Sequence, residues 1–183
     1  VVLLPDTVDA VKKILALCQR YQIPVVARGA GTGLSGGATP HPEGVLLSMA
    51  RFNQVLSIDQ VAATARVQPG GRNLAISEAV ADIGLYYAPD PSSQIACTIG
   101  GNVAENAGGV HCLKYGLTVH NVFSAQVVLM GGEILEIGGE ALDNPGYDLL
   151  AAFVGSEGML GVVTEVTVRL LPRPIAAKAL MSS

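Results

Sequence analysis

Aromatic and charged residues are both scarce in this 183-residue sequence, and their scarcity excludes several classes of protein. Aromatic residues make up 4% of the chain, tryptophan is missing, and charged residues make up 14% against about 25% in ordinary soluble domains. A disordered chain would be charged and poor in Val, Ile and Leu, so a half-hydrophobic composition excludes one. With 11 Lys plus Arg against 15 Asp plus Glu, the net charge is -4, and no basic stripe indicates a nucleic-acid partner.

Long apolar runs and paired cysteines are missing as well. The most apolar stretches, 127–130 and 149–154, fall far short of the ~20 residues of a membrane-spanning helix. No basic start precedes an apolar run, as it would in a signal peptide. The three widely spaced cysteines fit neither a disulfide framework nor a metal knuckle and are typical of the reducing cytoplasm. These cysteines are Cys18, Cys97 and Cys112.

The apolar pattern predicts an α+β domain of two lobes. A short β-type run at 1–4, a helix from Val8 and buried strands at 25–27 and 45–47 predict a β-α-β lobe with a small parallel sheet. We place this first lobe at residues 1–58.

The second lobe, at residues 59–175, is predicted to be larger and mainly antiparallel with helices. The segment 86–118 has no clear periodicity, and residues 176–183 are interpreted as the start of a linker. Strands are expected at 55–58, 62–67, 123–130, 133–137 and 161–171, and helices at 73–83 and 147–153.

In contrast to aromatic and charged residues, glycine is abundant, with 22 in the chain. The densest run, 28–37, follows the strand at 25–27 directly. Alternate glycines let the backbone adopt positive φ and gather several N–H groups in one concavity, which favours a phosphate or pyrophosphate ligand over a merely flexible surface loop. Formal matches to GxGxxG and GxSxG are rejected, because Gly36-Gly37, Pro40 and Pro42 would break the helix that either motif needs.

Two further glycine-rich segments lie at 89–109 and 155–161. The first is long, aperiodic and made of small or polar residues, which leaves room for a flat ligand, although a buried irregular segment would also fit. The second is also compatible with a simple helix-to-strand turn. Three such segments together indicate one large ligand with several phosphates. None of the histidines has a partner at metal-binding spacing, so no metal site is predicted.

Four motifs occur in a fixed order: IPVVARGAGTGLSGG (23–37), PDPSSQIACTIGGNVAENAGG (89–109), KYG (114–116) and GSEGMLGVVTEVTVRLLP (155–172). Together they resemble the PCMH-type FAD-binding domain of the vanillyl-alcohol oxidase / p-cresol methylhydroxylase superfamily. Within it, the resemblance is to FAD-linked 2-hydroxy-acid dehydrogenases of the glycolate, D-lactate and D-2-hydroxyglutarate type. It implies an oxidoreductase in which a substrate carbon gives a hydride to FAD.

The resemblance also implies which residues bind FAD. The first loop, 29–35, would hold the pyrophosphate through backbone N–H groups, and 90–98 would line the cofactor. Residues 100–102 would pass close to the flavin or its ribityl chain, 107–108 would allow close approach on the same side, and 157–163 would close over the adenosine end and the phosphates. FAD is expected to be non-covalent, because Thr32 stands near the place where some members attach it through a histidine. The residues implied are Gly29, Ala30, Gly31, Thr32, Gly33, Leu34, Ser35, Asp90, Ser92, Thr98, Gly100, Gly101, Asn102, Ala107, Gly108, Glu157, Gly161, Val162 and Val163.

A C-terminal substrate domain follows this module in the family and supplies most of the substrate pocket. The chain begins at Val1 without methionine and lacks that domain, so we expect an inactive piece whose catalytic base lies elsewhere. The implied partners are a small 2-hydroxy acid, an electron acceptor at the membrane periphery, and other oxidase subunits or a second copy. Two alternatives stay open: another flavoenzyme of the superfamily, such as an amino-sugar reductase or alkyl-ether lipid synthase, and a non-catalytic nucleotide-binding or subunit-interaction module.

Overall fold

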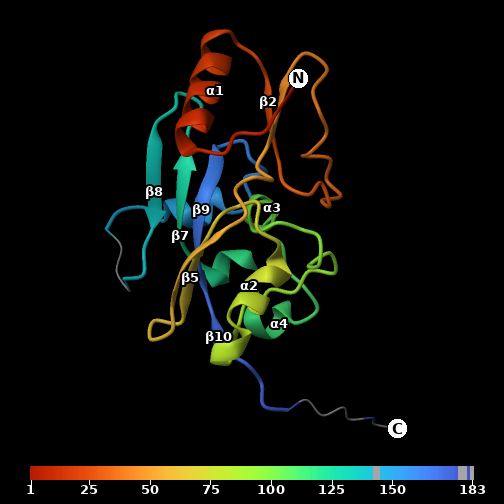
Figure 1. Cartoon of the computed structure of the whole chain (residues 1–183), viewed down its shortest axis with the longest axis vertical. Coiled ribbons are helices and arrows are strands. Elements are labelled where there is room, and N and C mark those ends of the chain that lie inside the picture. Colours follow the sequence, from red (N-terminus) through yellow and green to blue (C-terminus); the bar gives the residue numbers. More distant parts are fainter. Residues whose placement is uncertain (142–144, 177–180, 182–183) are drawn as a thin grey trace.

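Two sheets lie one beyond the other along the long axis of the molecule (Figure 1). The structure is a computed structural model that describes residues 1–141, 145–176 and 181. Most of the expected linker, 177–180 and 182–183, therefore lies outside the described residues. The mixed α+β architecture with one parallel and one antiparallel sheet confirms the predicted fold class.

The smaller sheet is parallel, in the order β1 (Val2–Leu3), β3 (Val45–Ser48), β2 (Val25–Arg28). Helix α1 (Val8–Arg20) connects β1 to β2, which run parallel on either side of β3, and a parallel connection of this kind needs a crossover. Thr7 begins this helix: its Oγ1 accepts a hydrogen bond from the Ala10 N–H at 3.2 Å.

The larger sheet has five strands in the order β4-β5-β9-β7-β8, and every neighbouring pair is antiparallel. The central strand, β9, consists mainly of the β-branched residues Val and Thr, which suits a strand buried within a sheet. The strands are β4 (Val55–Asp59), β5 (Thr64–Val67), β7 (Val122–Val128), β8 (Ile134–Gly138) and β9 (Val162–Arg169).

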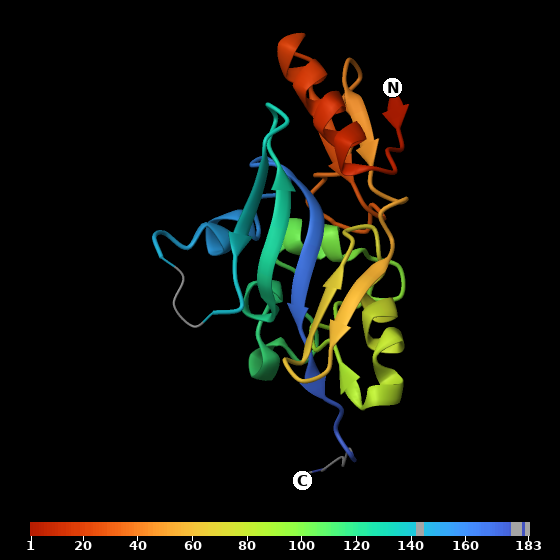
Figure 2. The same cartoon turned by 60° about the vertical axis from the view of Figure 1, so that its left-hand side comes forward.

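Short helices cover one face of the larger sheet (Figure 2). Their apolar residues, Ile76, Val80, Ile99, Val103 and Phe153, pack in one core with the inward side chains of the strands. These elements are α2 (Asn73–Ala79), α3 (Ile99–Glu105), α4 (Cys112–Tyr115), α5 (Leu149–Phe153), the 3₁₀ turns Ala81–Ile83 and Thr118–Asn121, and a strand pair, β6 (Leu85–Tyr86) with β10 (Leu171–Pro172).

Two expectations differ from the structure. The boundary at 58 cuts through β4, which belongs to the larger sheet because a short turn pairs it with β5; the smaller sheet ends at Ser48. The segment 86–118 has no clear apolar periodicity and no helix was expected in it, yet it contains α3 and α4. With 7 and 4 residues, these helices are too short to produce a recognisable apolar repeat.

The two lobes share part of a core. Val11, Leu15 and Leu47 of the smaller lobe pack in one cluster with Val128 and Val162, which lie at neighbouring ends of β7 and β9. This apolar contact fixes the end of β2, and with it the start of the glycine-rich loop, against the larger sheet.

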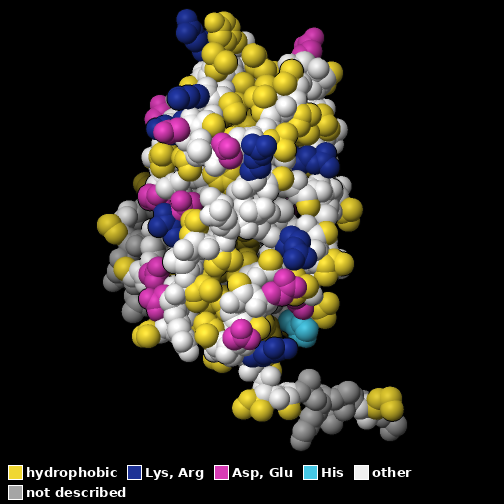
Figure 3. All heavy atoms as spheres, in the orientation of Figure 1, with side chains coloured by type: hydrophobic (Ala, Val, Ile, Leu, Met, Phe, Trp, Pro, Cys, Tyr) yellow, Lys and Arg dark blue, Asp and Glu magenta, His cyan; other side chains and the backbone are white. Residues whose placement is uncertain are grey.

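The surface carries no broad charged region on the face shown in Figure 3, where Lys and Arg are scattered among Asp and Glu. Within the part of the chain that the structure describes, no helix is both long and apolar enough to cross a membrane.

Leu15→Ala should lower the free energy of unfolding by about 2–5 kcal/mol, because Leu15 is fully buried in the shared cluster and alanine would leave a cavity there. Leu17→Ala on the same helix is the matched control. Leu17 is 53% exposed, so a change of at most about 0.5 kcal/mol is expected. Chemical denaturation measures both, and equal losses would contradict the shared core.

Candidate functional site

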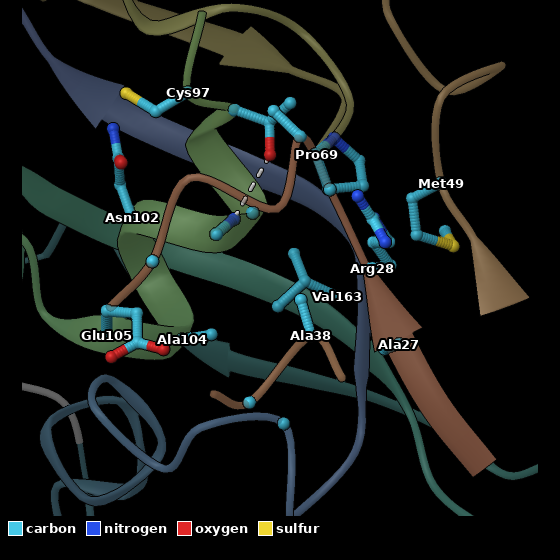
Figure 4. A pocket seen from close by; sticks show the side chains of 18 of the residues that line it. Ala27, Arg28, Ala38, Met49, Pro69, Cys97, Asn102, Ala104, Glu105 and Val163 are labelled. Atoms are coloured by element: carbon cyan, nitrogen blue, oxygen red, sulfur yellow. Dashed lines mark hydrogen bonds between the residues drawn. The ribbon is translucent and has the colours of Figure 1, made fainter. Parts of the chain in front are cut away.

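The three glycine-rich segments meet around one cavity of about 180 Å³ between the two lobes (Figure 4). One wall is the loop after β2, a second is one side of α3 along most of its length, and a third is the turn that leads into β9. Segments more than 120 positions apart in the sequence thus face the same space, as expected for a single ligand site.

Most of the residues that the resemblance implies line this cavity. They come from all three segments and are small, so that backbone rather than side chain forms much of the wall. They are Gly29, Ala30, Gly31, Thr32, Gly33, Thr98, Gly100, Gly101, Asn102, Ala107, Glu157, Gly161, Val162 and Val163.

Five of the implied residues lie outside the cavity. The Leu34 side chain is fully exposed, Ser92 is also exposed, and Gly108 packs against Leu117 and Cys112 instead. Ser35 and Asp90 hold lining segments in place through hydrogen bonds described below.

Several lining residues were not predicted. Arg28 and Ser156 lie within the first and last motifs, directly beside the implied residues Gly29 and Glu157, so those motifs could have indicated them. Met49 and Pro69 come from segments without any motif, and only the tertiary structure brings them to the cavity. Of the other lining residues, Pro91, Ser93, Cys97 and Gly158 lie within the ranges 90–98 and 157–163 that the resemblance implies, whereas Ala27, Gly37, Ala38, Ala104, Glu105 and Phe153 lie outside every implied range.

Helix α3 holds the second and third motifs together. At its start, the Thr98 Oγ1 accepts a hydrogen bond from the Gly101 N–H at 3.4 Å (Figure 4). Near its end, the Val103 and Ala104 carbonyls accept hydrogen bonds from the N–H groups of Gly155 at 2.8 Å and Glu157 at 2.9 Å. The turn before β9 is therefore attached to the same helix that lines the cavity.

The first motif is attached to α3 as well. Ser35 Oγ lies 2.9 Å and 2.8 Å from the two carboxylate oxygens of Glu105, so its hydroxyl donates to this carboxylate across the mouth of the cavity. Within the loop, Gly31 has φ +72°, a conformation that side chains other than glycine rarely adopt. The loop keeps this shape without helix or strand of its own, which agrees with the rejection of the GxGxxG and GxSxG readings.

Two buried polar atoms at the cavity have no hydrogen-bond partner among the described residues: Asn102 Nδ2 and Ser156 Oγ. Leaving a buried polar group unsatisfied costs about 1–3 kcal/mol, so such atoms are rare in folded proteins. The Asn102 amide nitrogen is a donor and the Ser156 hydroxyl can donate, so both suit the oxygen atoms of a phosphate or a polyol chain.

A second cavity, of about 450 Å³, lies beyond Asp90 and is lined by Tyr86, His111 and Tyr115. Two of its polar residues pair with each other: Asp90 Oδ2 lies 2.6 Å from His111 Nδ1, and the backbone N–H of His111 donates to Asp90 Oδ1 at 3.2 Å. The buried hydroxyl of Tyr87, which also lines this cavity, has no partner among the described residues. Burial and a hydrogen bond to Tyr115 raise the pKa of Tyr86 to about 12. The Asp90–His111 pair ties 89–91 to 109–111, which positions two segments close to the first cavity.

Acidic side chains outnumber basic ones at the first cavity. Glu105 and Glu157 are both exposed, whereas Arg28 is half-buried and is the one cationic side chain in the lining. Among the residues whose placement is described, no group of three His, Cys, Asp or Glu is arranged to hold a metal ion.

Sequence comparisons agree with this geometry. Residues 1–138 match the family model described as FAD binding domain. The chain is 66% identical over its whole length to glycolate oxidase subunit GlcD of Escherichia coli (strain K12) and covers 36% of that protein. It is 40% identical over 91% of its length to D-lactate dehydrogenase of Anaerostipes hadrus, and 40% identical over 95% to mitochondrial D-2-hydroxyglutarate dehydrogenase of Bos taurus, covering 35% and 32% of those proteins.

A solved structure with the same fold is that of alkyldihydroxyacetonephosphate synthase. It superimposes with a TM-score of 0.84 at 26% identity, over 96% of this chain and 32% of that one. The chain thus spans about a third of the length of the relatives it matches.

The two glycines at the start of α3 should respond differently to substitution. A Cβ on Gly101 would meet only Thr98 Oγ1 at 3.4 Å, so the side chain of Gly101→Val would project into the cavity. A Cβ on Gly100 would lie 2.6 Å from the Pro69 Cβ, so Gly100→Ala would force the helix away from Pro69. We expect Gly101→Val to prevent FAD binding at unchanged stability, and Gly100→Ala to lower stability by about 1–3 kcal/mol.

Thermal unfolding and a flavin fluorescence titration of each variant test this difference. FAD binding by Gly101→Val at the wild-type affinity would show that the ligand does not occupy the space beside Gly101.

Proposed function

Because the chain belongs to the family of FAD binding domains, we propose that it is the cofactor module of a flavin-dependent dehydrogenase that oxidises a small 2-hydroxy acid. FAD is the cofactor, and the three relatives above are named for glycolate, D-lactate and D-2-hydroxyglutarate. The observation that carries the proposal is the meeting of three glycine-rich segments around two buried polar atoms without partners, Asn102 Nδ2 and Ser156 Oγ.

The residues of the cavity fit FAD in three ways. The loop Gly29–Gly33 presents backbone with little side chain in the way, which suits the diphosphate. Asn102 and Ser156 offer hydrogen bonds to ligand oxygens. Gly161, Val162 and Val163 at the start of β9 form an apolar wall that suits a flat ring.

The enclosed volume of about 180 Å³ is smaller than the ~300–1,000 Å³ typical of ligand pockets. The cavity therefore encloses only part of a dinucleotide, and the rest would lie on the open side. We infer that other parts of the protein, present in relatives about three times longer, cover that side and supply most of the substrate contacts.

Bound FAD supplies the hydride acceptor, and the protein positions it and excludes water. This chain offers no group suited to take the hydroxyl proton within the described cavity. Glu105 is engaged by the Ser35 hydroxyl, and Glu157 is exposed on the turn before β9. We therefore place the catalytic base outside this chain, in the part that covers the cavity.

We also propose that FAD is held without a covalent bond, because the loop 29–37 contains no histidine and Thr32 takes its place. A visible absorption spectrum before and after acid precipitation tests this. Flavin bands that move into the supernatant are the expected result, and colour in the pellet would contradict it.

Titration of glycolate, D-lactate and D-2-hydroxyglutarate into the full-length protein should then bleach the flavin bands.

Two other results would change the proposal. Bound flavin that none of these acids reduces would favour another flavoenzyme on the same module. A full-length protein that takes up no FAD would favour an interaction module. His41→Ala is a suitable control for these measurements, because His41 lies on the exposed part of the loop outside the cavity and should not alter flavin content.

Asn102→Ala should weaken FAD binding about tenfold without lowering the stability of the apo-protein, because the Asn102 amide has no partner to lose until FAD binds. Asn73→Ala is the matched control. Asn73 is equally buried, but its Nδ2 donates to the Pro89 carbonyl at 3.1 Å, so its loss should lower the free energy of unfolding by about 1–2 kcal/mol. Calorimetric titration and denaturation separate the two effects, and destabilisation by Asn102→Ala would show a structural role instead.

A further inference from the structure

Arg28 is the last residue of β2, and its side chain extends into the cavity beside Met49 and Pro69 (Figure 4). The backbone at this position is well fixed, because Arg28 is in register with Ser48 of β3 and its carbonyl accepts a hydrogen bond from the Met49 N–H at 3.0 Å. The side chain therefore leaves a rigid strand at the point where the glycine-rich loop begins.

The guanidinium of Arg28 turns back over that loop. A Cβ placed on Gly31 would lie 2.6 Å from Arg28 Nη2 and 2.9 Å from Cζ, so the charged group rests directly against the middle of the loop. The absence of a side chain at Gly31 is thus needed twice, for its φ of +72° and for the approach of Arg28.

This guanidinium takes part in none of the ion pairs of the described residues, which join Lys12, Arg51, Arg66, Arg72 and His111 to acidic partners. It is half-buried, and a partly desolvated cation without a counter-ion is unfavourable. Neither carboxylate of the lining is a counter-ion for Arg28: Glu105 accepts a hydrogen bond from the Ser35 hydroxyl, and neither Glu105 nor Glu157 forms an ion pair with Arg28.

We propose that Arg28 is the counter-charge for the diphosphate of the bound dinucleotide and makes the cavity selective for ligands that carry one. The inference rests on the proposed function, since it assumes that FAD occupies this cavity. A guanidinium presents several N–H donors in a plane and can pair with two phosphate oxygens at once. Backbone N–H groups of the loop would donate to the other oxygens of the diphosphate. In a lining where carboxylates outnumber cations, Arg28 is the one charged side chain among the described residues that attracts a dianion.

The test compares Arg28→Gln and Arg28→Lys with the wild-type protein after removal of FAD. Arg28→Gln should weaken FAD binding by about ten- to a hundredfold, as expected for lost hydrogen bonds to a charged group. Arg28→Lys should recover part of that loss, because it keeps the charge without the planar donors. The affinity of the wild type should fall as NaCl is raised, and that of Arg28→Gln should fall less.

Competition experiments separate a charge effect from a change of shape. ADP carries the diphosphate and adenosine does not, so the advantage of ADP over adenosine in displacing FAD should shrink in Arg28→Gln while adenosine itself competes as before. Arg51→Gln is the matched control, since Arg51 pairs with Asp6 at 3.6 Å on the exposed surface and lies outside the cavity.

Three results would overturn the inference. Wild-type FAD affinity in Arg28→Gln would show that Arg28 does not contact the diphosphate. An equal loss of affinity for ADP and for adenosine in Arg28→Gln would show that Arg28 only shapes the cavity. Failure of the wild-type protein to bind FAD at all would reject the proposed function itself, which distinguishes that failure from the first two.

Discussion

The whole site depends on the burial of one short helix. Ile99 and Val103 of α3 are fully buried against the larger sheet, so the helix cannot shift without exposing them to water. The burial of these two side chains fixes the positions of the hydrogen-bonding groups of the helix. These groups are Thr98 at its start, the Val103 and Ala104 carbonyls near its end, and the Glu105 carboxylate at its last position. Each of the other two glycine-rich segments is attached to one of these groups.

The arrangement explains the unusual composition. A ligand that must approach backbone closely needs walls without side chains, so glycine and alanine replace larger residues at the cavity. Gly100 and Gly101 show that adjacent glycines serve different ends. Gly100 lets the helix pack against Pro69, whereas Gly101 leaves space open to the ligand. Charge is correspondingly scarce in the lining, which gives the single guanidinium of Arg28 a large influence on an anionic ligand.

The two cavities illustrate why volume alone does not identify a site. The larger one contains the Asp90–His111 pair, but no glycine lines it, and only Asp90 and Gln94 of its lining come from the three glycine-rich segments. The smaller one keeps buried atoms of Asn102 and Ser156 without partners. Tyr87 in the larger cavity also has a buried hydroxyl without a partner, so the meeting of all three glycine-rich segments is what distinguishes the smaller cavity. The Asp90–His111 pair contributes indirectly, since it holds together two segments close to the smaller cavity.

The sequence by itself determined the class of fold, the parallel character of the first lobe and the segments that form the site, because apolar periodicity and clustered glycines are local patterns. It also carried the family, through four motifs in order, and fourteen of the nineteen residues implied from it line the cavity. Tertiary structure alone decided that β4 joins the larger sheet, that α3 forms within an aperiodic segment, and that Met49 and Pro69 reach the cavity. It also separated Ser35 and Asp90, which hold neighbouring segments in place through hydrogen bonds, from the residues that line the cavity. These features depend on pairing and packing between segments far apart in the chain, and no local pattern of residues records such contacts.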